Sequence, residues 1–453
     1  MSGQLLRVLG RRDVLALAFG AIIGWSWVLM TGVWVVQAGT LGAVTAFLIG
    51  GVAMLLIGLT YAELASAMPR AGGEHVYSHR ALGKNMSFLC TWALILAYVT
   101  VVAFEPVALG LAISYLWPDF MAGELWTFAG AQVWLSWVAV GMAGAVILTY
   151  INLRGVRPAA VLQTVVTGII LFAGLFFGAG TLTAGNTANL EPLFSFGISG
   201  VLATLIMVPM MFIGFDVIPQ TAEEIDLPRR SIGLLLVVSV SMAIIWYLLM
   251  ILGTGLSFTS AELELQLLPT ADAASRAWGS EWAGKLIVLG GIAGIISSWN
   301  AFQVAASRVL FAMARDGLLP EWLADLHPRY RTPYKAVLVI GIFSFLAPLF
   351  GQEILVWCID AGGFAVIIAY GIVAASFLIL RRREPGLERP YRVRYGTLVG
   401  WGALLLSCAL LLVYLPGSPA ALIWPYEWLI LLGWGLLGLV FWLWARRDGQ
   451  SAR

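Results

Sequence analysis

Apolar stretches long enough to cross a membrane recur along the whole chain, and short polar connections separate them. A helix needs about 20 apolar residues to cross about 30 Å of hydrocarbon. We therefore predict an all-α polytopic membrane protein with membrane lipid around its helices. The twelve predicted transmembrane helices are 13–38, 41–67, 86–116, 131–152, 160–181, 199–225, 231–256, 283–313, 334–351, 354–380, 398–415 and 426–445.

Two of these stretches contain residues that a membrane helix normally avoids. The first contains Gly24-Trp25-Ser26, and the sixth contains Gly214 and Pro219. Glycine destabilises a helix interior by about 1 kcal/mol and proline by about 3 kcal/mol, so both helices can open inside the membrane. Opened backbone is tolerated there only against protein or beside a water-filled cavity. Interrupted helices in matching halves of a membrane chain indicate the substrate site of a secondary transporter.

Composition and charge agree with a membrane location. Of the 453 residues, 60% are hydrophobic and 11% are charged, whereas soluble domains carry about 25% charged residues. All Lys and Arg residues except Arg276 and Lys285 lie on one side if both termini are cytoplasmic. This asymmetry predicts a multi-pass protein of the inner (cytoplasmic) membrane with both termini in the cytoplasm. The net charge of +2 is then a topology signal, so no nucleic-acid partner is expected, and no obligate protein partner is evident.

The first interruption has two interpretations. If the helix unwinds at Gly24-Trp25-Ser26, the freed N–H groups and the following half-helix form a site for an anionic group such as a carboxylate. Alternatively, Gly20 and Gly24 form a GxxxG face against which another helix packs closely. The matching interruption around Gly214 favours the binding site.

Two acidic residues inside predicted spans are candidates for coupling. Asp216 could accept backbone N–H groups, hold a substrate ammonium or take a coupling proton, or it could simply cap the half-helix that follows the interruption. Glu105 precedes Pro106, which frees a backbone carbonyl one turn earlier. Intramembrane acids are functional candidates because they are costly to bury. Glu105 could therefore couple a proton or recognise a cationic substrate, and the alternative is a neutral, hydrogen-bonded side chain.

Other polar motifs suggest less chemistry. The hydroxyl groups of Ser297 and Ser298 could bind Na⁺ together with carbonyl groups from the first interruption, or they could bond back to the preceding helical turn. His75 and His79 lie in a predicted polar loop without a third metal ligand, so no zinc site is expected. The chain has no Walker A, HExxH or nucleophile-elbow motif. We therefore expect neither an enzyme nor an ATP-driven pump, and no cofactor.

Three stretches of the chain resemble a known family. They are Tyr61–Tyr77, Ala306–Pro320, and Phe212–Asp216 with the Ala222-Glu223-Glu224 triplet after it. The chain resembles the amino acid–polyamine–organocation (APC) transporter superfamily over nearly its full length. The resemblance implies one transporter domain with a LeuT-like fold: two inverted five-helix repeats, 13–181 and 199–380, and two additional helices in 398–445. Helices 1 and 6 of that fold are discontinuous.

The resemblance also implies a midplane substrate site and alternating access to it. Residues 23–26 would hold the carboxylate of an amino acid or related amine, and residues 212–215 would supply carbonyl groups and an aromatic wall. Met210, Phe104 and Phe302 would shape the side-chain pocket. The implied substrate-binding residues are Ile23, Gly24, Trp25, Ser26, Phe104, Met210, Phe212, Ile213, Gly214, Phe215 and Phe302.

The chain departs from the family pattern in two ways that bear on coupling and binding. Gly24-Trp25-Ser26 stands where relatives usually have a triplet such as Gly-Ser-Gly. Some proton-coupled relatives carry a lysine in helix 5, but 158–181 contains none. Candidate Na⁺ ligands are therefore the carbonyl groups of Gly20 and Ile23 with the hydroxyl groups of Ser297 and Ser298.

These features predict a secondary active transporter for amino acids or amines, coupled to H⁺ or Na⁺. An uncoupled exchanger needs neither cation. A membrane sensor that keeps the fold and binds an amine without transporting it is the rival from another class.

Overall fold

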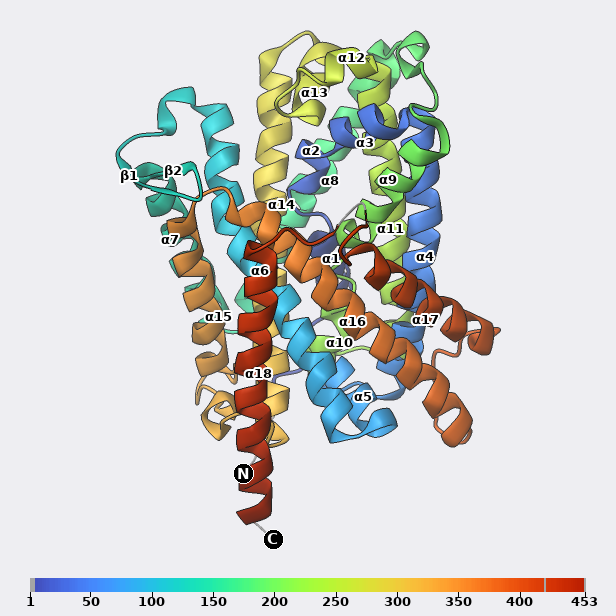
Figure 1. Ribbon diagram of the computed structural model, residues 1–453, viewed down its shortest axis with the longest axis vertical. Helices are drawn as coiled ribbons and strands as arrows, with labels where there is room; N and C mark the ends of the chain where they lie inside the picture. Colours follow the sequence, from blue (N-terminus) through green and yellow to red (C-terminus); the bar gives the residue numbers. More distant parts are fainter. Residues whose placement is uncertain (1–4, 419–420, 452–453) are drawn as a thin grey trace.

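The computed structural model describes residues 5–418 and 421–451. Within them, nine helices are long and apolar enough to cross a membrane. They are α4 (Thr40–Ala67), α6 (Lys84–Leu116), α7 (Leu135–Leu153), α8 (Val156–Ala184), α11 (Arg229–Ser257), α14 (Glu281–Arg315), α16 (Ile354–Arg383), α17 (Gly396–Val413) and α18 (Tyr426–Ser451). The bundle in Figure 1 is therefore an almost entirely helical polytopic membrane protein.

The three other predicted spans contain shorter helices. The first comprises α1 (Arg11–Ile22), α2 (Ser26–Leu29) and α3 (Thr31–Ala38), and the sixth comprises α9 (Gly197–Met211), α10 (Val217–Gln220) and η3 (Ala222–Glu224). The ninth contains α15 (Tyr334–Leu346) and η5 (Ala347–Phe350). Helix thus stops between 22 and 26 and between 211 and 217, where glycine in an apolar stretch predicts an interruption.

A β-hairpin replaces the predicted start of the fourth span. β1 (Glu124–Phe128) pairs antiparallel with β2 (Ala131–Trp134), and α7 begins only at Leu135. Ala129 and Gly130 form the turn with φ of 49° and 91°, the conformation that a two-residue hairpin turn requires. The prediction of helix from residue 131 was wrong because buried Ala131 and Val133 alternate with exposed Gln132, a strand pattern that the longer apolar run obscured.

The remaining elements lie in the connections. They are α5 (Glu74–Leu82), α12 (Ser260–Leu263), α13 (Pro269–Trp278), η1 (Pro118–Phe120), η2 (Thr187–Leu190) and η4 (Glu321–Ala324). The prediction of a polar loop around His75 and His79 was wrong, because both residues lie on α5. His75 is fully buried there and bonds to Ser87 on α6 at 2.7 Å, so tertiary contacts stabilise this short helix.

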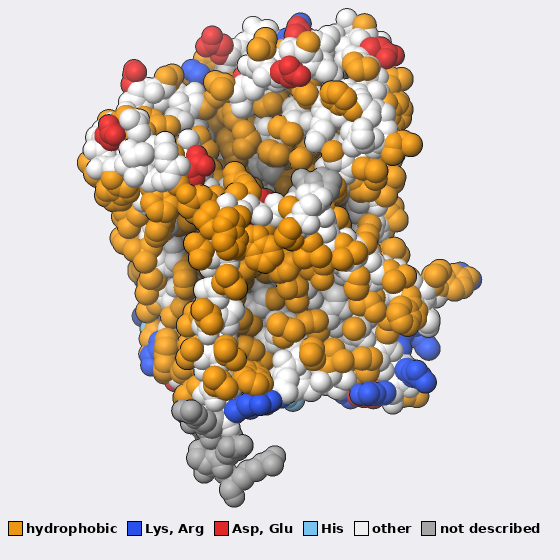
Figure 2. Space-filling model, viewed as in Figure 1, with side chains coloured by type: hydrophobic (Ala, Val, Ile, Leu, Met, Phe, Trp, Pro, Cys, Tyr) orange, Lys and Arg blue, Asp and Glu red, His pale blue; other side chains and the backbone are white. Residues whose placement is uncertain are grey.

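Charge divides the molecule into two ends. In Figure 2, Lys and Arg side chains gather at the end that carries α5, and Asp and Glu side chains gather at the end that carries α12 and α13. We refer to these as the basic end and the acidic end. Figure 2 also shows that this face is hollowed below the acidic end.

Two helices form the centre of the bundle. Each of these helices contains an apolar stretch of 18 residues. In α6 and α14, 83% of that stretch is buried, compared with 28% in α17 and 11% in α18. α6 and α14 carry Glu105 and Ser298, so these polar residues lie where the bundle is most enclosed.

A pair of tryptophans fastens α18 to this centre. The Trp92 indole N–H on α6 donates to the Trp434 carbonyl, and the Trp434 indole N–H donates to the Trp92 carbonyl, each at 2.9 Å. Their rings stack with centroids 4.7 Å apart. This reciprocal contact gives both indole N–H groups a partner and holds the largely exposed α18 against the buried α6.

Candidate functional site

The first interruption faces α6 and α14. A Cβ at Gly24 would lie 3.3 Å from Ser298 Oγ and 3.4 Å from Glu105 Oε1. A Cβ at Gly294 would lie 2.3 Å from the Gly24 carbonyl oxygen, so α14 approaches the opened backbone closely because it has a glycine there. The interruption is thus enclosed by protein, as hydrocarbon requires.

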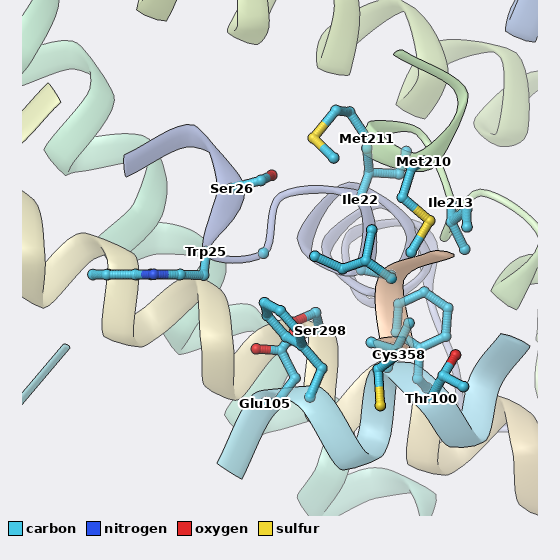
Figure 3. Close-up of a pocket in the computed structure, with 16 residues that line it drawn as sticks. Ile22, Trp25, Ser26, Thr100, Glu105, Met210, Met211, Ile213, Ser298 and Cys358 are labelled. Atoms are coloured by element: carbon cyan, nitrogen blue, oxygen red, sulfur yellow. The ribbon is translucent and has the colours of Figure 1, made fainter. Parts of the chain in front are cut away.

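Trp25 is accommodated by a second glycine. It is 2% exposed, and a Cβ at Gly291 would lie 2.4 Å from its ring. Figure 3 shows the Trp25 ring directed away from Met210 and Ile213. The bulk of Trp25 therefore packs mainly on α14 and leaves the space between the interruptions open.

The second interruption contacts the first through Gly214. This residue has φ of 128°, and a Cβ there would lie 2.7 Å from the Ala21 carbonyl carbon and 2.8 Å from the Ile22 nitrogen. Only glycine combines that backbone conformation with so close an approach. Gly214 therefore brings the two opened segments together.

Asp216 stabilises the second interruption. Its Oδ1 accepts from the Gly214 backbone N–H at 2.9 Å and from the Tyr370 hydroxyl at 3.3 Å. Its Oδ2 accepts from the Tyr98 hydroxyl at 2.5 Å. Asp216 occupies the N-cap position of α10 but makes no side-chain capping bond there. Of the roles that the sequence suggests for Asp216, the structure shows the acceptance of a backbone N–H group. Asp216 is not among the residues that line the pocket.

A pocket lies between the interruptions (Figure 3). Nine residues that the sequence singles out line it: Gly24, Trp25, Ser26, Phe104, Glu105, Met210, Ile213, Ser298 and Phe302. The other lining residues are Ala21, Ile22, Thr100, Val101, Met211, Cys358 and Ile359. The pocket thus takes its walls from α1, α2, α6, α9, α14 and α16, elements that are far apart in sequence.

Four of the implied binding residues are not among those that line the pocket. They are Ile23, Phe212, Gly214 and Phe215. The Phe212 ring packs on Tyr247 at 5.5 Å between centroids, and the Phe215 ring packs on Tyr61 at 5.4 Å. These aromatic contacts support the second interruption from behind. Sequence reasoning identified neither Thr100 nor Cys358 as a pocket residue.

Glu105 is the only charged side chain among the lining residues, all of which the structure describes. Its side chain is buried, and Oε1 accepts from the Ser298 hydroxyl. Oε2 has no hydrogen-bond partner among the described residues. A buried carboxylate oxygen without a donor is costly, so this atom can accept a proton or an ammonium group.

The two adjacent serines have different surroundings. Ser298 faces Glu105 and also donates to the Gly294 carbonyl at 3.1 Å, a bond to the preceding turn. Ser297 faces the other way, where the Gln163 side-chain N–H donates to its hydroxyl oxygen at 2.6 Å. A Cβ at Gly20 would lie 2.1 Å from Ser297 Oγ. Adjacent residues on a helix point about 100° apart, and here they contribute to two separate clusters.

Ion pairs close the bundle toward the basic end. Arg308 on α14 donates to both carboxylate oxygens of Glu224, at 3.0 and 2.9 Å, and both side chains are only 1% exposed. The Glu224 carbonyl accepts from the backbone N–H groups of Val8 and Leu9, each at 2.9 Å. This ion pair therefore ties α14 to the segment after α10 and to the chain before α1.

A second contact at this end joins α5 to the end of α14. His75 Nε2 lies 2.8 Å from Asp316 Oδ2. This hydrogen bond lowers the pKa of Asp316, because it favours the carboxylate form. The described residues include no cluster of three metal-binding side chains.

Known proteins resemble this chain along most of its length. It is 27% identical to the branched-chain amino acid permease BcaP of Bacillus subtilis (99% of this chain, 95% of the relative). It is 26% identical to the methylthioribose transporter of the same organism (98% and 95%). It is 30% identical to the vacuolar cationic amino acid transporter 2 of Arabidopsis thaliana (85% and 61%).

The family comparison covers nearly the whole chain. Residues 9–438 match the family described as "Amino acid permease". This range contains both interruptions and every residue that lines the pocket. The resemblance to the APC superfamily is thereby confirmed, and the chain belongs to the amino acid permease family.

Proposed function

We propose that this protein is a secondary active transporter that moves amino acids or related amines by alternating access. The observation that carries the proposal is the pocket between two interrupted helices, with one unpaired carboxylate oxygen in its wall. A membrane protein tolerates opened backbone at such a place because substrate and water meet it there. The full proposed topology has twelve spans, with inverted repeats 13–181 and 199–380 and two additional helices in 398–445.

We assign the basic end to the cytoplasm, which makes the protein an inner-membrane transporter with both termini inside. The gathering of Lys and Arg at that end supports this orientation. The hollow below the acidic end then faces outward, and the Arg308–Glu224 ion pair closes the cytoplasmic side. For the pocket to open toward the cytoplasm, Arg308 and Glu224 must move apart.

Within the pocket, we assign the substrate carboxylate to the opened backbone at 24–26. Its ammonium group would lie against Glu105, because this is the one lining carboxylate and it is adjacent to Gly24. Phe104, Phe302 and Met210 would contact the side chain. The names of the relatives, which cover branched-chain and cationic amino acids, support an amino-acid substrate.

Uptake into proteoliposomes tests the transport function. We expect saturable uptake of at least one radiolabelled substrate from a panel of amino acids and amines, with Na⁺ and pH gradients imposed separately. Binding of an amine without uptake under any gradient would favour the membrane sensor instead. If the protein neither binds nor takes up any amino acid or amine, the pocket is not a substrate site.

The Glu105→Gln variant tests the role of the pocket carboxylate. We expect it to lose the pH dependence of uptake, because an amide cannot gain or release a proton. Its KM for amino acids should rise by at least about tenfold, the effect of losing one charge-assisted hydrogen bond. The rate and KM are measured between pH 5 and pH 8 as an experimental range, with Glu264→Gln, the same change at an exposed acid outside the pocket, as the control. Wild-type rates at every pH would exclude Glu105 from coupling.

A further inference from the structure

A buried polar cluster lies behind the first interruption and outside the pocket. At its centre is Gln163 on α8, which is fully buried. Its amide nitrogen donates to Ser297 Oγ at 2.6 Å and to the Ala16 carbonyl at 3.2 Å. The Thr167 hydroxyl donates to the same carbonyl at 3.2 Å. The cluster therefore joins α1, α8 and α14 at one point.

The orientation of this amide follows from its neighbours. One side-chain atom of Asn300 lies 3.1 Å from the Ala159 carbonyl oxygen. Because a carbonyl oxygen only accepts hydrogen bonds, this atom of Asn300 must be its amide nitrogen. The same nitrogen lies 2.8 Å from Gln163, so the facing atom of Gln163 must be its oxygen. The nitrogen of Gln163 then necessarily points at Ala16 and Ser297. Both ends of the amide are satisfied, which makes a flipped arrangement unfavourable.

This arrangement does not suit a sodium ion. Na⁺ would need several free oxygen atoms, and the sequence offers Ser297, Ser298 and carbonyl groups of α1 for it. Instead, Ser297 receives an N–H donor and Ser298 bonds to Glu105. A Cβ at Gly20 would lie 2.1 Å from Ser297 Oγ and 2.5 Å from the Gln163 nitrogen, so these groups crowd the α1 backbone.

We propose that the neutral amide of Gln163 permanently takes the place that a coupling cation would fill between α1, α8 and α14. It supplies the same bridging contacts through N–H donors. Because an amide neither dissociates nor ionises, a Na⁺ gradient cannot act through this cluster. Substrate movement is then independent of Na⁺, and Glu105 is the titratable group in the pocket wall through which a proton gradient could act. This inference rests on the proposed transport function.

The Gln163→Glu variant gives the sharpest test, because it changes the amide nitrogen to an oxygen at nearly constant shape. One new carboxylate oxygen can still accept from Asn300. The other replaces the amide nitrogen beside the Ala16 carbonyl and Ser297, and the Thr167 hydroxyl lies 3.2 Å from that same carbonyl. These oxygen atoms form a cluster suited to a hard cation. The matched control is Gln303→Glu, since Gln303 is also fully buried but bonds to Thr149, at 2.8 Å.

Melting temperature is compared in equal concentrations of NaCl and KCl, and uptake of L-leucine and L-arginine is compared in the same salts. For the wild type, we expect equal melting temperatures and equal uptake in the two salts. For Gln163→Glu, we expect Na⁺ to raise the melting temperature by about 2 °C, as for a ligand at about ten times its Kd. Gln303→Glu should show no difference between the salts.

Two outcomes would overturn the inference: a wild-type protein stabilised or accelerated by Na⁺, or a Gln163→Glu variant no more sensitive to Na⁺ than Gln303→Glu. If Gln163→Glu does not fold, the comparison of the wild type in NaCl and KCl still tests the inference. A wild type that transports nothing contradicts the proposed function, whereas the melting temperatures still test the cluster.

Discussion

Replacing Arg308 by alanine is expected to lower the free energy of unfolding by about 3–5 kcal/mol. Arg308 and Glu224 are each 1% exposed and share two hydrogen bonds. Removing the guanidinium leaves a buried carboxylate without a partner, and its desolvation is then uncompensated. The loss is measured by denaturant titration in detergent, with tryptophan fluorescence as the signal.

A neighbouring ion pair provides the control. Arg315 donates to Glu223 at 3.0 Å, but these side chains are 36% and 22% exposed. Partly solvated pairs contribute about 0–1 kcal/mol, so Arg315→Ala should change stability by no more than that. Equal effects of the two arginine substitutions would contradict the importance of burial.

A double substitution separates stability from gating. Arg308→Met with Glu224→Leu removes both buried charges, and stability should return to near the wild-type value. The tie between α14 and the segment after α10 is lost nonetheless. We therefore expect this variant to fold but to expose cysteines introduced at the basic end to water-soluble thiol reagents more readily. Wild-type labelling rates in the double variant would mean that other contacts close this side.

Replacing Gly214 by alanine is expected to reduce uptake by at least about tenfold. A non-glycine residue at φ of 128° costs about 1–3 kcal/mol. The added methyl group would also lie 2.7 Å from the backbone of Ala21, which must then move. Because this contact joins the two interruptions, the pocket wall on both sides shifts.

The control for Gly214 is Gly168→Ala on α8. A Cβ at Gly168 meets nothing within 4 Å, and alanine is the better helix former by about 1 kcal/mol. Uptake and expression of this variant should equal those of the wild type or exceed them slightly. Normal uptake by Gly214→Ala would show that the two interruptions do not need their close contact.

The interruptions could be predicted from sequence because their cause is local. Gly24 and Gly214 weaken helix within a few residues of where the helices end, at Ile22 and Met211. The hairpin at 124–134 could not be predicted, since a short strand with two buried apolar residues resembles the beginning of an apolar helix. The length of the apolar run outweighed the alternation inside it.

Site residues could be predicted only where the residue stands out within its own segment of sequence. Glu105 is conspicuous as an acid in an apolar span, and it does line the pocket. Gln163 is a single neutral residue whose partner Ser297 lies 134 positions away, so no local pattern reveals it. The separation of Ser297 from Ser298 follows from helix rotation, which requires knowing the neighbours of both faces. Tertiary contacts therefore determine the part that sequence reasoning missed.

The reciprocal tryptophan contact between α6 and α18 has a consequence for synthesis of the protein. Its two residues are 342 positions apart, and chains form from the N-terminus onward. Until residue 434 is made, the Trp92 indole N–H lacks this partner, and an unpaired polar group costs several kcal/mol in hydrocarbon. The last helix thus completes the hydrogen bonding of an early one. A chain that ends before residue 434 therefore keeps an unpaired indole N–H group on α6.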